Sequence, residues 1–251
     1  NKRRGKGKKY AEIQRVRLGS RLLAYLPSRV NDGLIEVLRR FREKAEQVGI
    51  QQFFIQTHFE SPLEVTEEAI QATLLEAGWI ITNQAVFTVA ASRRGHTARL
   101  REVLNRIGIL TYYTFSVKGF EENYALFAPN SRSLQEMLEE KVYGDLPVEL
   151  EKEILELLKY PERIPSELPD LLDKYWQPFL ATDRNVMNLP GIGKSMTYQT
   201  VGMTKEGKRI LRFSLDVGRR HSPQVDHEGE IYIVESKSIA AYLRQLQALG
   251  E

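Results

Sequence analysis

Gln52-Phe53-Phe54-Ile55-Gln56 begins the stretch of sequence that decides the fold. This apolar run has the length of a strand that is buried in a sheet. A segment with helical periodicity follows, which starts at Thr66 and ends at Gly78. Ile80–Val89 is a second strand-like run. A strand, a helix and another strand in this order are typical of a βαβ unit with parallel strands.

The same alternation continues on both sides of this unit. Its further segments are strands at Ile13–Leu18 and Ile109–Phe115 and helices at Gly33–Val48, His96–Ile107 and Ser131–Glu140. Asn31 or Asp32 opens the first of these helices, and Gly49 closes it. The alternation predicts an α/β fold built on a parallel sheet.

The alternation stops between residues 145 and 182, where acidic and leucine-rich segments are broken by prolines. We expect a helical insertion here, packed outside the sheet. Beyond it, Ser195–Gly202 and Arg209–Asp216 have the pattern of a β-hairpin, and Ile231–Val234 is a last strand before a closing helix. The chain therefore divides into βα units at 1–144, the insertion at 145–182 and a final region at 183–251.

Composition limits the classes of protein that the chain can belong to. Its 251 residues are 42% hydrophobic and 27% charged, which suits one or two globular domains. We expect no membrane segment, because no apolar run approaches the roughly 18 residues that a spanning helix needs. There is no cysteine, which is compatible with a reducing cytoplasm and means that no thiolate of this chain can hold an iron–sulfur cluster.

The charge balance does not favour a nucleic-acid partner. A net charge of +3 is small, and the one dense basic run, at residues 2–9, has no interleaved aromatic side chains that could stack on bases. We expect this run to be a solvated loop, and the alternative is a phosphate-binding arm.

Lys194 lies in the glycine-containing loop Met187-Asn188-Leu189-Pro190-Gly191-Ile192-Gly193-Lys194-Ser195. Glycine lets the backbone approach a ligand closely, and a lysine in such a loop can form a Schiff base or hold an anion. A nucleotide phosphate loop is disfavoured, because Asn188 occupies the position of its first glycine. An ordinary turn with a solvated lysine stays open as an alternative.

Polar residues follow the predicted strands. Ligand groups gather at the carboxyl ends of parallel strands. The polar groups at these ends are Gly19-Ser20-Arg21, Thr57-His58-Phe59, Asn83-Gln84 and Tyr113 to Lys118. We expect them to line one cleft.

These motifs, in this order, resemble the carboxyl-terminal part of lysine 2,3-aminomutase-type radical S-adenosylmethionine enzymes. The resemblance runs from about Ile13 to His221. Its motifs are Arg17-Leu18-Gly19-Ser20-Arg21, Leu26-Pro27-Ser28-Arg29, Thr57-His58-Phe59 with Pro62 and Glu64-Val65-Thr66-Glu67-Glu68, Asn83-Gln84, Tyr112-Tyr113 and Pro190-Gly191-Ile192-Gly193-Lys194.

The resemblance implies the carboxyl-terminal portion of a partial (β/α) barrel of the radical S-adenosylmethionine type. It also implies an isomerase that moves an α-amino group to the β carbon, with S-adenosylmethionine, pyridoxal 5′-phosphate and a [4Fe-4S] cluster as cofactors. Lys194 matches the lysine that carries pyridoxal 5′-phosphate, and Gly191 and Gly193 would let the loop close on it.

Three further residues match positions on the S-adenosylmethionine side of the cleft: Arg21, His58 and Gln84. Structural roles stay open for each of them. Arg21 could pair with an acidic helix residue, His58 could be a hydrogen-bonded structural histidine, and a backbone group could satisfy Gln84. His221 and His227 are too isolated to predict a metal site.

Two departures from the family concern the substrate. Members that act on lysine use two carboxylates to hold its side-chain ammonium, and the matching positions here are Lys118 and Asn188. Lys118 would repel a cation and bind a carboxylate, so we expect an acidic substrate, L-glutamate, with β-glutamate as product. The alternative is that Lys118 faces solvent and Asn188 caps a turn.

A third departure is the missing C-x-x-x-C-x-x-C segment, which holds the cluster in the family. We expect the chain to be part of a longer enzyme, inactive alone and a homo-oligomer when complete. One alternative is a cluster-free relative that binds pyridoxal phosphate or an acidic metabolite without turnover. A weaker one is a basic RNA-binding accessory domain.

Overall fold

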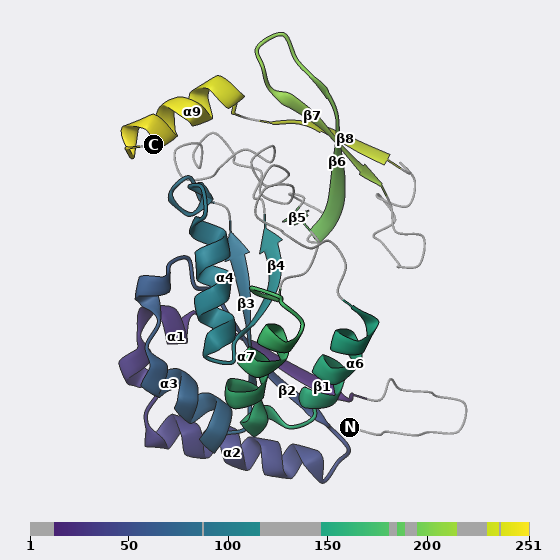
Figure 1. Cartoon of the computed structure of the whole chain (residues 1–251). Coiled ribbons are helices and arrows are strands. Elements are labelled where there is room, and N and C mark those ends of the chain that lie inside the picture. The colour runs from purple at the N-terminus through teal and green to yellow at the C-terminus, as the bar shows by residue number, and fades with distance from the viewer. Residues whose placement is uncertain are drawn as a thin grey trace, which may run out of the picture. The chain divides into compact units, whose positions relative to one another are not determined.

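The computed structural model describes residues 13–86, 88–115, 147–180, 185–188, 195–214, 230–235 and 237–250 (Figure 1). The chain forms two compact units. Unit 1 consists of Asn1–Asn83, Arg101–Thr111 and Asp145–Leu180, and unit 2 consists of Gln84–Leu100, Tyr112–Gly144 and Ala181–Glu251.

The described strands follow one another in the sheet in the order of the sequence, and strands that are consecutive in the sequence are hydrogen-bonded to each other. Its first strands are β1 (Arg15–Gly19), β2 (Gln52–Thr57), β3 (Ile80–Val86) and β4 (Leu110–Phe115). β1, β2 and β3 are parallel, with Gly19 beside Gln56 and Thr57 beside Asn83. The predicted parallel sheet is confirmed, although β3 ends three residues before the predicted Val89.

Helices connect these strands. The connecting elements are α1 (Leu22–Tyr25), η1 (Pro27–Arg29), α2 (Asp32–Glu46), η2 (Pro62–Glu64), α3 (Glu67–Gln71), the π-helical turn η3 (Ala72–Glu76), η4 (Ala90–Ser92) and α4 (His96–Arg106). As predicted, Asn31 caps α2: its side chain accepts a hydrogen bond from the Leu34 backbone N–H at 3.1 Å. Gly49 follows the helix with a φ of 90°, a conformation that glycine adopts without strain.

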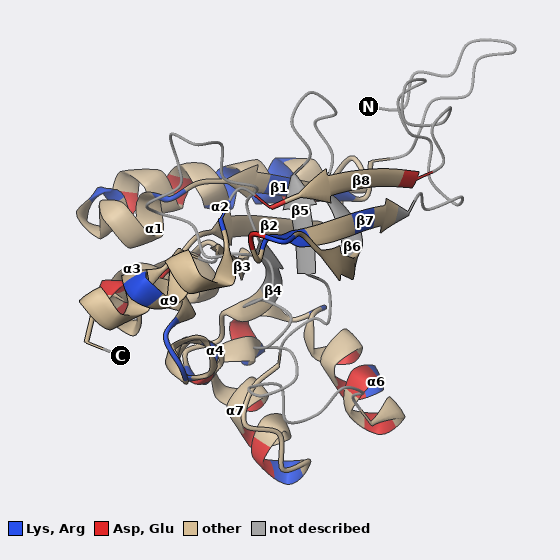
Figure 2. Ribbon diagram, turned by 90° about the horizontal axis from the view of Figure 1, so that it is seen from above, with Lys and Arg blue, Asp and Glu red and all other residues tan. Residues whose placement is uncertain are grey.

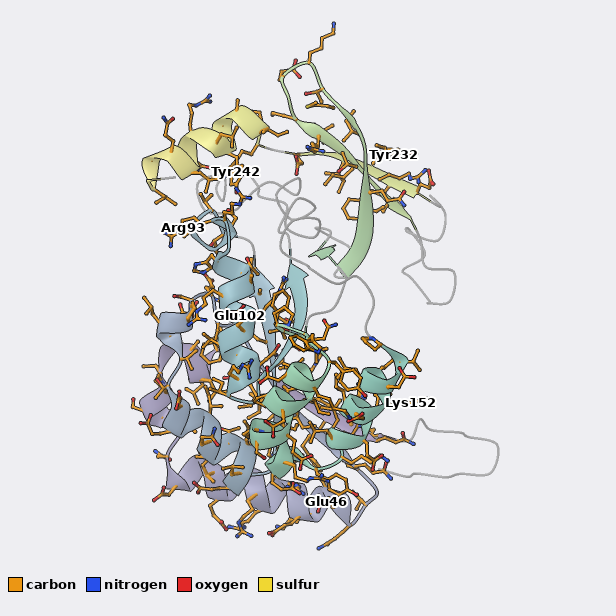
Figure 3. All side chains as sticks on the ribbon, in the orientation of Figure 1. Glu46, Arg93, Glu102, Lys152, Tyr232 and Tyr242 are labelled. Atoms are coloured by element: carbon orange, nitrogen blue, oxygen red, sulfur yellow. The ribbon has the colours of Figure 1, made fainter. Side chains whose placement is uncertain are left out.

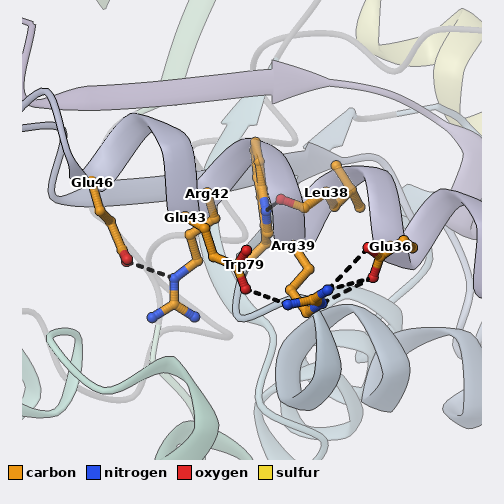
Figure 4. Close-up of polar contacts among 7 residues, drawn as sticks. All are labelled: Glu36, Leu38, Arg39, Arg42, Glu43, Glu46 and Trp79. Atoms are coloured by element: carbon orange, nitrogen blue, oxygen red, sulfur yellow. Dashed lines mark hydrogen bonds and ion pairs between the residues drawn. The ribbon is translucent and has the colours of Figure 1, made fainter.

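α2 covers one face of the unit 1 sheet through an aromatic cluster. The ring of Phe53 on β2 lies 5.4 Å from that of Trp79 and 6.3 Å from that of Phe41 on α2. The Trp79 indole N–H donates to the backbone oxygen of Leu38 at 3.1 Å (Figure 4). Arg39, which Figure 4 also shows, pairs with Glu36 on the exposed side of α2.

The region that is expected to be a helical insertion does form helices, which pack on the other face of the same sheet; that it is an insertion stays an expectation. It consists of α6 (Val148–Leu157), η6 (Pro161–Arg163) and α7 (Ile164–Lys174). Successive side chains of a strand point to opposite faces, so Phe54 points away from the cluster that Phe53 joins. Phe54, Ile80 and Leu110 pack with apolar residues of α6 and α7, and Figure 2 marks the charged residues along these two helices.

Unit 2 is built on an antiparallel sheet. Its strands and closing helix are β5 (Asn185–Asn188), β6 (Ser195–Met203), β7 (Arg209–Ser214), β8 (Glu230–Val234) and α9 (Ile239–Ala248). β5 is parallel to β4, and β5 to β8 are antiparallel to one another, which confirms the predicted hairpin. Leu211 and Phe213 of β7 are fully buried. Tyr242 on α9 shares a hydrogen bond with Ser92 at 2.8 Å (Figure 3).

Several expectations are not decided by these elements. The mixed α/β fold with a parallel and an antiparallel part is present, whereas closure into a partial barrel stays an expectation. The predicted helix at Ser131–Glu140 lies outside the described residues. Within the described ranges, none of the helices combines the length and the apolar character that crossing a membrane requires.

α7 ends in a turn that normally contains glycine. The backbone N–H of Gln177 donates to the Leu172 oxygen at 2.8 Å, and that of Trp176 donates to the Asp173 oxygen at 3.1 Å. This is the Schellman arrangement, in which the residue after the cap is left-handed. That residue is Trp176, with a φ of 56° and a side chain that is 86% exposed.

Replacing Trp176 should therefore affect stability through the backbone. We expect Trp176→Gly to be more stable than Trp176→Ala by about 1 kcal/mol, because both lose the indole but only alanine keeps the left-handed strain. Urea unfolding followed by circular dichroism measures the difference. Equal stabilities of the two variants would contradict this explanation.

Candidate functional site

The loop that follows β2 in unit 1 carries the predicted His58. Its backbone is held by two side chains. Asn83 accepts a hydrogen bond from the Phe59 N–H at 2.6 Å and donates one to the Phe59 oxygen at 3.2 Å. Glu64 accepts hydrogen bonds from the N–H groups of Glu60 at 2.8 Å and Ser61 at 3.3 Å. The backbone that follows His58 is thus held by Asn83 of β3 and by Glu64.

His58 is neutral at physiological pH. Its side chain is buried, and burial lowers its pKa to about 4, with the positive charge of Arg21 acting in the same direction. Nε2 has no hydrogen-bond partner in the part of the chain that the structure describes, although it lies 3.4 Å from Oε1 of Glu60. This contact is between an uncharged imidazole and a carboxyl group, so we do not regard it as an ion pair. Nε2 is therefore a buried polar atom whose hydrogen-bonding capacity is not used by the described residues.

Glu60 holds its proton more tightly than an ordinary glutamate. Burial raises the pKa of its carboxyl group, the negative charge of Glu64 raises it further, and Arg21 opposes both effects. Burial and Glu64 thus both favour the uncharged form of this carboxyl group, which lies beside the neutral imidazole of His58.

Arg21 is the cation of this cluster. It lies between the end of β1 and the start of α1, and its guanidinium group donates to the Tyr25 hydroxyl at 3.1 Å and stacks 5.5 Å from that ring. Among the described residues no carboxylate pairs with Arg21. The alternative role, an ion pair with an acidic helix residue, is therefore not found there. The guanidinium group is exposed and can bind an anionic or polar group.

The side chain of Gln84 lies on the opposite face of β3 from that of its neighbour Asn83. Since side chains alternate along β3, Gln84 shares its face with Thr82, and the parallel register puts Gln56 of β2 beside Thr82. Gln84 is half-buried, whereas Gln56 and Thr82 are buried. The side chains of Asn83 and Gln84 therefore point to opposite faces of β3.

The structure brings together only some of the predicted site residues. It places Arg21 and His58 in one cluster at the ends of β1 and β2. Gly191, Gly193, Lys194 and Lys118 lie outside the described residues. The same is true of His221, His227 and the basic run at 2–9. Asn188 is the last residue of β5 and pairs with Ser195, but its side chain is not described.

Sequence reasoning missed Glu60, and it did not predict the roles of Asn83 and Glu64, which it named only as parts of motifs. A local signal existed for Glu64, because Ser61-x-x-Glu64 is a capping-box pattern and forms one at η2. No local signal existed for Asn83, which contacts a residue 24 positions earlier. Among the described side chains, no group of three or more His, Asp or Glu residues could hold a metal ion.

Comparison with known proteins gives relatives but no matching family model. An uncharacterized KamA family protein of Methanocaldococcus jannaschii is 37% identical over 50% of this chain and 19% of its own length. Glutamate 2,3-aminomutase of Clostridioides difficile is 31% identical over 44% of this chain and 25% of its own length. L-lysine 2,3-aminomutase of Bacillus subtilis is 27% identical over 49% of this chain and 25% of its own length.

These relatives are KamA-family proteins, so the resemblance inferred from the sequence motifs is confirmed. The chain spans a quarter or less of the length of each of them.

The low pKa of His58 predicts an acid-sensitive fold. Between pH 6.5 and about 4 the unfolded chain protonates this histidine while the folded chain does not. The contribution of His58 to the free energy of unfolding is therefore fully present above pH 6.5. It is lost as the pH falls, by about 3 kcal/mol at most. The glutamine of His58→Gln does not titrate, so this variant should lose less stability over the same range in urea unfolding. Identical losses in both proteins would show that His58 does not cause the effect.

Proposed function

We propose that this chain forms part of an amino-acid 2,3-aminomutase, an isomerase that moves an amino group from the α to the β carbon. The observation that carries the proposal is the similarity to glutamate and lysine 2,3-aminomutases. The cluster at the ends of β1 and β2 supports it, because ligands of parallel sheets bind at this edge. The partial barrel of the radical S-adenosylmethionine type is part of the same proposal.

The described residues fit a polar ligand such as S-adenosylmethionine. The unpartnered Nε2 of buried His58 offers a hydrogen bond, and the Arg21 guanidinium group has no carboxylate partner among the described residues. When bound, S-adenosylmethionine supplies the radical that takes a hydrogen atom from the substrate. His58 and Arg21 would bind and orient this cofactor. A role for Gln84 at the same cofactor stays a prediction from the family resemblance.

Pyridoxal 5′-phosphate is assigned to the loop at 187–195. This cofactor holds an amino acid through its amino group and stabilises electron density at the adjoining carbon. Lys194 would attach it, and Gly191 and Gly193 would let the backbone approach it. Since the chain contains no cysteine, a [4Fe-4S] cluster would be held by residues outside it, and the chain alone would not turn over substrate.

Covalent trapping tests the cofactor assignment on this chain itself. After incubation with pyridoxal 5′-phosphate and reduction with borohydride, we expect the label on the peptide that contains Lys194 and its loss in Lys194→Ala. Peptide mass spectrometry gives the position. Lys205→Ala, which changes a lysine of the β6–β7 turn, is the control and should keep the label. Labelling elsewhere, or none, would contradict the assignment.

We further propose that the substrate is L-glutamate. Lys118 would form a charge-assisted hydrogen bond with the side-chain carboxylate, and the neutral Asn188 would tolerate that negative charge. The glutamate 2,3-aminomutase among the relatives supports this choice of substrate.

The cluster-free alternative, which binds cofactor or acidic metabolite without turnover, is favoured by the absence of cysteine.

Lys118→Asp tests the substrate in an enzyme that joins this chain to a cysteine-bearing cluster segment. We expect kcat/KM for glutamate to fall about 10- to 100-fold, since a charge-assisted hydrogen bond contributes about 1.5–3 kcal/mol. Lys205→Asp makes the same charge change in the β6–β7 turn and should have little effect. Unchanged glutamate kinetics in Lys118→Asp would refute the assignment. Cofactor binding without any turnover would support the cluster-free alternative.

A further inference from the structure

We infer that Asn83 is a positioning residue of the β2-end site, which fixes His58 by holding the backbone of the next residue, Phe59. The inference rests on the proposed function for the identity of the ligand. The positioning itself depends only on contacts within unit 1.

The side-chain amide of Asn83 satisfies both backbone groups of Phe59 at once. Its oxygen accepts from the N–H at 2.6 Å, and its nitrogen donates to the carbonyl at 3.2 Å. Asn83 is 2% exposed and Phe59 is fully buried, so water cannot readily replace either bond. Because Asn83 lies on β3, the amide ties the loop after β2 to the neighbouring strand.

His58 immediately precedes the residue that is held. Its own Nε2 makes no hydrogen bond to the described residues, so no such bond from this nitrogen orients the side chain. The groups that face it are Arg21, Glu60 and, through Glu60, Glu64. The orientation of the imidazole therefore depends on the backbone, which Asn83 holds on one side of it.

Removal of the amide would leave two buried backbone groups of Phe59 without partners. They would gain partners only if the loop opened to water. An opened loop would hydrate the His58 imidazole, and hydration favours the protonated form. Loss of positioning would thus be visible in the titration of His58, even without any ligand.

A matched residue exists for the control. Asn105 is also fully buried, accepts a hydrogen bond from the Leu180 backbone N–H and donates one to the Ile109 oxygen at 2.8 Å. It holds backbone at the amino end of β4, whereas His58 lies beyond the carboxyl end of β2. Asn105→Ala removes the same chemical groups from unit 1 without touching the His58 loop.

The experiment is an NMR titration of the histidines in the whole chain. There are four histidines, and His58→Gln identifies the signal of His58. We expect its pKa to rise from about 4 towards about 6.5 in Asn83→Ala and to stay unchanged in Asn105→Ala. Asn83→Ser makes the same test if the alanine variant does not fold. An unchanged pKa in a folded Asn83 variant, or an equal rise in Asn105→Ala, would overturn the inference.

Calorimetry with S-adenosylmethionine separates this inference from the proposed function. We expect binding to the same chain to weaken by about tenfold in Asn83→Ala and not in Asn105→Ala. If the unmodified chain does not bind S-adenosylmethionine, the cofactor assignment is wrong, while the titration still decides whether Asn83 positions His58. If binding is equally strong in Asn83→Ala, the amide does not position His58 for this ligand.

Discussion

Helices pack on both faces of the parallel sheet of unit 1, so β2 must present apolar side chains to both faces. This constraint determines the arrangement of the rest of that unit. Phe53 must face α2 and Trp79, while Phe54 must face α6 and α7. A shift of one residue in the register of β2 would exchange the two faces and expose both sets of apolar side chains. The packing of the faces therefore fixes the register, and the register fixes which residues arrive together at the carboxyl ends of the strands.

The contact between Asn83 and Phe59 is a direct result of that register, because Asn83 lies beside Thr57. Each backbone group of Phe59 would cost about 1–3 kcal/mol if it were buried without a partner. The exposed Arg39–Glu36 ion pair on α2, by comparison, contributes little, because water and salt screen it. The buried amide, and not the more numerous surface charges, therefore determines the geometry around His58.

The elements of the fold were predictable because their signals are local. The alternation of apolar and helical segments gave the parallel strands, and Asn31 and Gly49 marked the ends of α2. The rule that ligands bind at strand ends placed Arg21 and His58 together. The role of Asn83 could not be predicted, since it depends on the register between two strands. Trp176 was missed for the opposite reason: a local rule expects glycine at its position, and the sequence breaks that rule.

The backbone N–H groups of the His58 loop are already hydrogen-bonded, and this limits the kind of ligand that the loop can select. Consecutive backbone N–H groups can form a concave nest that binds phosphate or another anion. Here the N–H groups of Phe59, Glu60 and Ser61 are already occupied by oxygens of Asn83 and Glu64. This loop thus offers no main-chain nest, and recognition at the β2 end is assigned to side chains such as Arg21. Selectivity that resides in side chains can be altered by single substitutions without rebuilding the loop.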